Sequence, residues 1–178
     1  MKRLLKIMAI ALMATAQVSH ALAENPAISE HAVKAVLFYK LPHFVYLPEE
    51  AKSRVLNLCA LGSHPVVAAL EKLAQTSVDN RTATFQVVGG AGEAGRCDFV
   101  YISRDETASL DALLHRLDGR DVVTVSDIPG FARSGGMVEF AQDPESASVR
   151  ILINRKAARK QGIEFNAQLL RLARIVEP

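Results

Sequence analysis

Residues 97–126 read CDFVYISRDETASLDALLHRLDGRDVVTVS, and this stretch decides the fold. Two short apolar runs, CDFVYIS at 97–103 and VVTVS at 122–126, flank a segment at 110–117 whose leucines follow helical spacing. The continuous apolar character of VVTVS is typical of a strand that is buried on both faces of a sheet. The stretch therefore predicts two strands of a parallel sheet joined by a crossover helix.

The same alternation extends toward the amino terminus. Apolar runs at 55–61 and 82–88 have the length of strands. Two further segments have apolar residues at helical spacing; one follows Ser29 and the other runs over 66–74, with Ser63 before it. Both serines are predicted N-caps, because a hydroxyl can accept a hydrogen bond from a free amide of the first turn.

Toward the carboxyl terminus the pattern changes. Residues 136–142 and 148–154 are predicted strands separated by a turn of hairpin length. Asn154 is the predicted cap of a final helical region at 155–176, which is broken near Gly162 and carries an apolar stripe. The chain as a whole predicts an α/β three-layer sandwich: a largely parallel sheet with crossover helices, a C-terminal antiparallel hairpin and C-terminal helices.

The first 23 residues predict a secretory signal peptide. A basic start precedes an apolar core at 7–16, and Ala21-Leu22-Ala23 has the small residues that signal peptidase selects. A membrane anchor or a core helix is the alternative, but a membrane span needs about 20 apolar residues and Gln17 interrupts this run. We therefore expect cleavage after Ala23, and a single domain at 24–178 that works in the periplasm.

The charge of this mature domain is close to zero. The leader holds three of the 21 basic residues and none of the 19 acidic ones, which leaves a net charge of −1. This balance does not favour binding to nucleic acid or to an anionic membrane. No second apolar run approaches membrane length, so no membrane insertion is expected after cleavage.

The two cysteines, Cys59 and Cys97, both lie at the edges of predicted strands. An even number of cysteines in an oxidising compartment favours a disulfide bond. Two separate buried thiols are the alternative. A catalytic redox pair is disfavoured because the chain has no C-x-x-C spacing.

The motifs of common enzymes and cofactor sites are missing from the sequence. The string at 90–95, GAGEAG, fits G-x-G-x-x-G, but a predicted strand follows it where a dinucleotide site needs a helix, so we expect a loop. The histidines are scattered and neither Ser63 nor Ser134 lies in a G-x-S-x-G elbow, so we predict no metal, no cofactor and no enzyme. A secreted hydrolase whose site assembles only in three dimensions stays open as an alternative.

A second alternative is a periplasmic module that binds a small molecule. In parallel α/β sheets, ligands bind beyond the carboxyl ends of the strands, which here correspond to 62–64 and 127–131. His64 in the first segment can equally cap a helix or pack on the surface. The candidates for contact with a ligand or partner are His64, Asp127, Phe131, Gly135, Gly136 and Met137.

Four of these candidates also have structural explanations. Phe131 and Met137 lie near a turn and are expected in the core more than in a partner contact. Gly135 and Gly136 permit a positive φ where the chain enters the strand at 136–142.

The order and spacing of several segments resemble the YfiR family of periplasmic proteins, over roughly residues 33–176. The matching segments are LCALG at 58–62, CDFVYIS at 97–103, VVTVSD at 122–127, GFA at 130–132, GGMV at 135–138, VRILIN at 149–154, AA at 157–158 and LLRLA at 169–173.

The resemblance implies a regulatory function. Similar proteins bind the periplasmic sensor part of an inner-membrane diguanylate cyclase and repress cyclic-di-GMP synthesis, until oxidation or release of the repressor relieves the block. Family members are associated with biofilm control and with dimers. Cys59 and Cys97 match the disulfide positions of the family. Gly135-Gly136-Met137 matches a segment that the family uses to form its fold.

This sequence departs from the family at two places. Some relatives have additional cysteines, whereas this chain has only two. Relatives often carry a Trp-Pro pair after the first helix, whereas this chain has no tryptophan and reads FVYLP at 44–48. A redox response would therefore depend on Cys59 and Cys97 alone, and the second departure leaves a partner contact at 44–48 unsupported.

Overall fold

The computed structural model describes residues 29–48, 55–74, 83–146 and 148–177. The predicted signal peptide and its cleavage site after Ala23 lie outside the described residues. Short 3-10 helices at Leu41–Phe44 and Arg104–Ser109 accompany the main helices and strands. The main helices and strands are α1 (Glu30–Lys40), β1 (Val45–Tyr46), β2 (Leu56–Leu61), α2 (Pro65–Ala74), β3 (Ala83–Val88), α3 (Ala91–Ala94), β4 (Phe99–Ile102), α4 (Leu110–Leu117), β5 (Val123–Ser126), β6 (Val138–Gln142), β7 (Val149–Ile153), α5 (Arg155–Lys160), β8 (Glu164–Phe165), α6 (Ala167–Leu172) and β9 (Arg174–Ile175).

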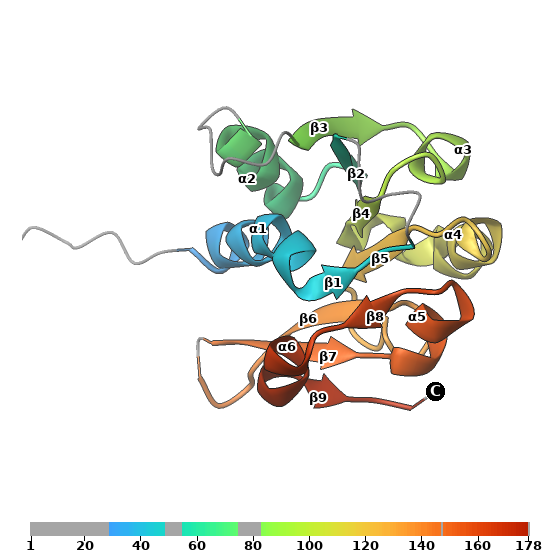
Figure 1. The fold of residues 1–178 in the computed structure, drawn as a ribbon. Coiled ribbons are helices and arrows are strands. Elements are labelled where there is room, and N and C mark those ends of the chain that lie inside the picture. Colours follow the sequence, from blue (N-terminus) through green and yellow to red (C-terminus); the bar gives the residue numbers. More distant parts are fainter. Residues whose placement is uncertain (1–28, 49–54, 75–82, 147, 178) are drawn as a thin grey trace, which may run out of the picture.

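The main sheet has seven strands in the order β3-β2-β4-β5-β6-β7-β9 (Figure 1). The strands from β3 to β6 pair in parallel, β6 and β7 form an antiparallel hairpin, and β9 pairs in parallel with β7. The predicted α/β fold, with a largely parallel sheet and a C-terminal hairpin, is confirmed.

Helices cover both faces of the sheet, because the central strands are apolar on both sides. Leu58, Phe99 and Val123 face α1 and α2 in one hydrophobic cluster. Cys59 and Val100 point to the opposite face, where they pack with buried residues of α3 and α4 in a second cluster. The alternation of neighbouring residues between two cores produces the three layers.

The second core contains a disulfide bond between Cys59 and Cys97. Cys59 lies in β2, and Cys97 lies two residues before β4, the neighbouring strand. The two Cα atoms are 6.1 Å apart. Both residues are buried, with at most 4% of their surface exposed. The bond therefore joins two adjacent strand segments inside the core.

Two of the three predicted helix caps are present. The Ser29 hydroxyl accepts a hydrogen bond from the Ala32 amide over 3.2 Å, and the Asn154 side chain accepts one from the Ala157 amide over 2.9 Å. Ser63 behaves differently, because its hydroxyl donates to Asp105 over 2.8 Å. The helix that follows begins at Pro65, so the predicted cap at Ser63 is wrong.

The glycine-rich segment at 90–95 is not only a loop. Ala91–Ala94 forms the single-turn helix α3, because Ala91 and Ala94 bury their methyl groups against the second core. The Glu93 carboxylate accepts a hydrogen bond from the Gly89 amide over 2.8 Å, which stabilises the turn. The prediction of a plain loop is therefore corrected.

The C-terminal region also differs from the prediction of a helical region at 155–176 that is broken near Gly162. It forms α5 and α6 with the two-residue strands β8 and β9 between and after them. β8 pairs with β1, which was itself not predicted, and β9 pairs with β7. Such short strands have no apolar alternation, and distant partners determine their pairing. In the expected apolar stripe, Leu169 is buried at 3% exposure whereas Leu172 is 73% exposed.

Over the described ranges, no helix has both the length and the apolar character needed to cross a membrane.

Candidate functional site

The carboxyl ends of three parallel strands meet at one edge of the main sheet. Leu61 of β2 is in register with Ile102 of β4, and Ile102 is in register with Ser126 of β5. The segments that follow these strands are therefore neighbours, at the edge where open parallel sheets bind ligands. These segments are 62–64, 103–105 and Asp127.

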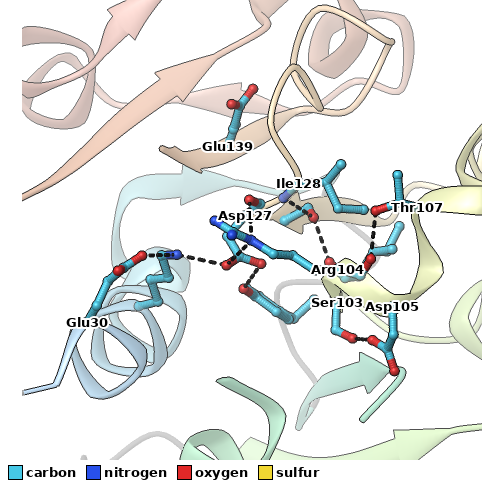
Figure 2. A network of polar contacts seen from close by, with 12 residues as sticks. Glu30, Ser103, Arg104, Asp105, Thr107, Asp127, Ile128 and Glu139 are labelled. Carbon is cyan, nitrogen blue, oxygen red and sulfur yellow. Dashed lines mark hydrogen bonds and ion pairs between the residues drawn. The ribbon is translucent and has the colours of Figure 1, made fainter. Parts of the chain in front are cut away.

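Asp127 is the centre of a buried charge network at this edge (Figure 2). Its side chain is inaccessible to solvent. One carboxylate oxygen accepts a hydrogen bond from the Tyr101 hydroxyl over 2.7 Å. The other accepts from Lys34 Nζ over 2.7 Å and pairs with Arg104 Nε over 2.9 Å. Both oxygens of the carboxylate are thus occupied by side chains of the protein.

Lys34 brings helix α1 into the network. Its side chain is only 1% exposed, although it lies in an amphipathic helix where a lysine is expected to reach solvent. Lys34 also forms an ion pair with Glu30, one turn earlier on the same helix. The row of charges Glu30–Lys34–Asp127–Arg104 therefore alternates in sign and joins α1 to the ends of β4 and β5.

Tyr101 connects this polar network to the first core. Its ring packs edge to face against Phe38 of α1, with centroids 5.8 Å apart, and its hydroxyl reaches Asp127. Edge-to-face packing is a preferred aromatic geometry. The same side chain thus contacts α1 through its ring and the end of β5 through its hydroxyl.

The network changes the proton affinity of its members. Burial raises the pKa of the Asp127 carboxyl, but hydrogen bonds from Lys34 and Tyr101 and the positive charges of Lys34 and Arg104 outweigh it, so the pKa lies below its usual value. Burial, with the negative charge of Asp127, raises the pKa of the Tyr101 hydroxyl. Asp127 is therefore ionised and Tyr101 is a hydrogen-bond donor at neutral pH.

A second polar cluster lies beside the network, around Asp105. Its carboxylate accepts hydrogen bonds from the Ser63 amide over 2.7 Å and from the Ser63 and Ser103 hydroxyls. Burial acts to raise the pKa of this carboxyl, but the hydrogen bonds from Ser63 outweigh it and lower the pKa. Gly62 has a φ of +97°, and a side chain there would overlap Ser103 and Asp105. The positive φ and the nearness of Ser103 and Asp105 thus favour glycine at this position.

His64 lies next to a second histidine at this edge. Its ring meets that of His31 edge to face, with centroids 5.4 Å apart. The Nδ1 atom of each ring is buried and has no hydrogen-bond partner among the described residues. His64 therefore contacts α1, and the proximity of the two histidines could not be read from their spacing in the sequence.

The remaining predicted candidates are divided between other environments. Phe131 is fully buried in the second core and Met137 is buried in the first, so the structural explanation describes both better than a surface contact. Gly135 has the expected positive φ of +107°, but Gly136 does not. A methyl group on Gly136 would overlap the Phe131 ring, so this glycine is required for packing.

The loop that carries these residues is held by Glu139 of β6. Its buried carboxylate accepts hydrogen bonds from the Gly130 amide over 3.1 Å and the Ala132 amide over 3.0 Å. Figure 2 shows Glu139 above Asp127, on the neighbouring strand. The loop after Asp127 is therefore anchored to the sheet.

Sequence reasoning found Asp127 and His64 but missed Glu30, Lys34, Tyr101 and Arg104. One signal was available, since Lys34 interrupts the apolar positions of the first helix. The chemistry of the assembled edge is that of a structural ion network. Within the described residues, no group of three or more histidine, cysteine, aspartate or glutamate side chains is placed to hold a metal ion.

The profile of one protein family, described as YfiR/HmsC-like, matches residues 31–174 of the sequence. The protein belongs to the YfiR/HmsC-like family. This family consists of periplasmic regulatory proteins, and its match includes every residue of the polar edge except Glu30. No curated protein matches the chain.

Two solved structures share the fold of this YfiR/HmsC-like protein. One is a conserved domain protein from Vibrio cholerae O1 biovar El Tor, with a TM-score of 0.59 and 11% identity. The other is described as an ABC domain in complex with L-Trp from Streptococcus pneumoniae, with a TM-score of 0.57 and 12% identity. Each match covers 83% of this chain but only 60% and 61% of the other chains. At this identity the likeness shows the fold alone.

Acid is expected to weaken this YfiR/HmsC-like fold through Asp127. The folded-state pKa of Asp127 lies below the ordinary value of 3.8, so the unfolded chain binds more protons in this range. The stabilisation from Asp127 is complete above about pH 5 and is lost as the pH falls through the folded-state pKa.

Urea unfolding of the wild type and of Asp127→Asn at about pH 7, 5, 4 and 3 measures this loss. The difference in unfolding free energy between the two proteins should be constant from pH 7 to pH 5 and should shrink below pH 4. A difference as large at pH 3 as at pH 7 would contradict the assignment.

Proposed function

We propose that this protein binds the periplasmic sensor region of an inner-membrane diguanylate cyclase and represses cyclic-di-GMP synthesis. The observation that carries the proposal is the YfiR/HmsC-like match over residues 31–174. A periplasmic regulator cannot reach the cytoplasmic catalytic domain of such an enzyme, so it must act through the part of the cyclase that lies outside the inner membrane.

Repression of this kind requires a difference in affinity. The protein must bind the inactive state of the cyclase more tightly than the active state, and only this difference shifts the equilibrium. Allosteric couplings between sites typically change an affinity about 5–150-fold. Free energy that is spent on ordering the binding surface weakens the affinity, so a surface that already has its bound shape in the free protein suits this function.

The buried charge network supports this requirement. It holds α1 against the end of β5 through the Lys34–Asp127 pair, whose side chains are almost fully removed from water, and Arg104 joins the same carboxylate from a half-exposed position. An ionised side chain that is buried without a partner is strongly unfavourable, so the network favours one position of α1 over displaced ones. We propose that the network maintains the surface that the cyclase recognises.

The signal peptide at 1–23, cleavage after Ala23 and a single mature domain at 24–178 belong to the same proposal. So does a homodimer, the assembly that the family resemblance implies. Light scattering on the protein purified from the periplasm measures the dimer, and amino-terminal sequencing of the same sample locates the cleavage site.

Deleting the gene is expected to raise cyclic-di-GMP severalfold in cells that express the cognate cyclase, because the inactive state of the cyclase is then no longer stabilised by the bound repressor. Extraction and mass spectrometric quantification of cyclic-di-GMP measure this change. The wild-type gene supplied in trans should restore the low level, and a copy without residues 1–23 should not.

The matched control replaces the cyclase with one that has its periplasmic region removed. Its cyclic-di-GMP output should be the same with and without this protein. An unchanged level after deletion, with the intact cyclase present, would overturn the proposal. A response of the truncated cyclase would show that the effect does not pass through the periplasmic contact.

The geometry of the polar edge favours neither alternative function. A small ligand at Asp127 would have to displace protein side chains, because three of them already occupy both carboxylate oxygens. A hydrolase needs a nucleophile bonded to an effective base, whereas the Ser63 and Ser103 hydroxyls donate to Asp105, a carboxylate whose lowered pKa makes it a weak base. We therefore propose no second function at this edge.

A further inference from the structure

A cavity of about 340 Å³ lies on the α4 side of the sheet, away from the polar edge. Its floor includes Thr124, near the start of β5, and Met137, directly before β6. Helices α4 and α5 provide two of its walls and lie at the same end of the sheet (Figure 1). Cavities of this size accommodate small organic molecules.

Positive charge is concentrated around this cavity. Arg133, Lys156 and Lys160 line it together with one acid, Asp118, so the lining carries a net charge of +2 when His115 is neutral. No ion pair or side-chain hydrogen bond engages these three cations within the described part of the chain. The mature domain as a whole is close to neutral, so this local excess is a specific feature of the cavity.

The rest of the lining is a framework held by hydrogen bonds. Asn154 is 1% exposed; its amide nitrogen donates to the Ala132 carbonyl over 2.8 Å, and its oxygen caps α5. The Thr124 oxygen accepts from the Met137 amide over 3.1 Å, so its own proton can still be donated. These bonds hold α5 and the loop before β6 around the cavity.

One polar atom of the lining has no partner. The Gln161 Oε1 atom is buried and accepts no hydrogen bond from the described residues. Buried polar groups are nearly always satisfied, and an exception calls for an explanation. A turn of the Gln161 side chain toward the cavity would let a ligand hydroxyl or amino group donate to this oxygen.

We propose that this cavity binds a small organic anion, in which a carboxylate or phosphate group lies among Arg133, Lys156 and Lys160. The apolar side chain of Leu114, which is only partly buried, contacts the body of the ligand. The site lies outside the Asp127 network, and the inference does not depend on the proposed cyclase partner.

Calorimetric titration of the protein purified from the periplasm tests the site, with succinate, glycerol 3-phosphate and inorganic phosphate as probes and glycerol as the neutral control. At least one anion should bind, more weakly as salt is raised, and glycerol should not. Tighter binding of succinate or of the phosphate compounds identifies the preferred anionic group.

The variant Lys156→Gln/Lys160→Gln should weaken binding at least about 10-fold, the effect of losing hydrogen bonds to a charged group. The matched control is Arg155→Gln/Arg159→Gln, which removes two charges from the same helix outside this cavity and should change affinity less than about twofold. Thermal unfolding of both variants verifies that they fold.

If none of the anions bound when supplied at about 10 mM, the proposal would be overturned. A dissociation constant above that concentration is too weak for a site in which charged side chains hold the ligand. An equal loss in the control variant would also overturn it, because the attraction would then come from the overall charge of α5.

Discussion

Replacing Asp127 with leucine is expected to lower the free energy of unfolding by about 3–5 kcal/mol near pH 7. The change leaves Lys34, which is 1% exposed, with Glu30 as its only remaining ionic partner in the described network. It also leaves the Tyr101 hydroxyl without its acceptor. Urea unfolding followed by circular dichroism measures the loss.

A double variant separates the ionic mechanism from a simple packing defect. Lys34→Met/Asp127→Leu removes both buried charges, and apolar replacements of a buried pair are often neutral or stabilising. Arg104 is 38% exposed at its side chain and can turn toward solvent. The double variant should therefore be more stable than Asp127→Leu alone.

The surface pair of Asp143 and Arg150 provides the control. Its atoms are 2.7 Å apart, but the Arg150 side chain is 44% exposed, so water screens the interaction. Asp143→Asn should change stability little. If Asp127→Leu were no more destabilising than Asp143→Asn, the network would not hold α1 in place.

Removing the disulfide is the second large expected effect. Cys59→Ala/Cys97→Ala should lower the free energy of unfolding by about 4 kcal/mol, because the bond closes a loop between residues separated by 38 positions. Without it, the unfolded chain has more conformations and folding must overcome the added entropy. Alanine is the suitable replacement, since a serine at either buried position would bring a hydroxyl into an apolar core.

Reductant provides an independent measurement of the same quantity. Dithiothreitol should lower the urea midpoint of the wild type and leave that of the double alanine variant unchanged. The chain contains only these two cysteines, so no other disulfide within the chain can contribute. A wild-type midpoint that does not respond, although mass spectrometry shows free thiols, would contradict the expected stabilisation.

Much of the fold could be predicted from the sequence, because its signals are local. The apolar runs of β2, β4, β5 and the hairpin have strand length, and α1 and α4 have clear helical spacing. Ser29 and Asn154 cap helices by contacts within three residues. The signals failed where pairing depends on a distant partner, as in β8 with β1 and β9 with β7.

The candidate site was predictable only in part. Its location at the carboxyl ends of the strands follows from the parallel topology, and this placed the candidates Asp127 and His64 at the same edge. The partners of Asp127 come from α1, β4 and the turn after β4, and Lys34 is 93 residues away along the chain. No spacing rule links residues so far apart.

The sequence by itself determined the layers of the fold and the positions of most strands and helices, because local periodicity decides which side of each element is buried. It also supplied the two cysteines and the segments that resemble the YfiR family. Only the tertiary structure decided which charges are buried together, and it placed Phe131 and Met137 in two different cores. The physical reason is that ion pairing and burial act through space, whereas helix and strand patterns act between near neighbours in the chain.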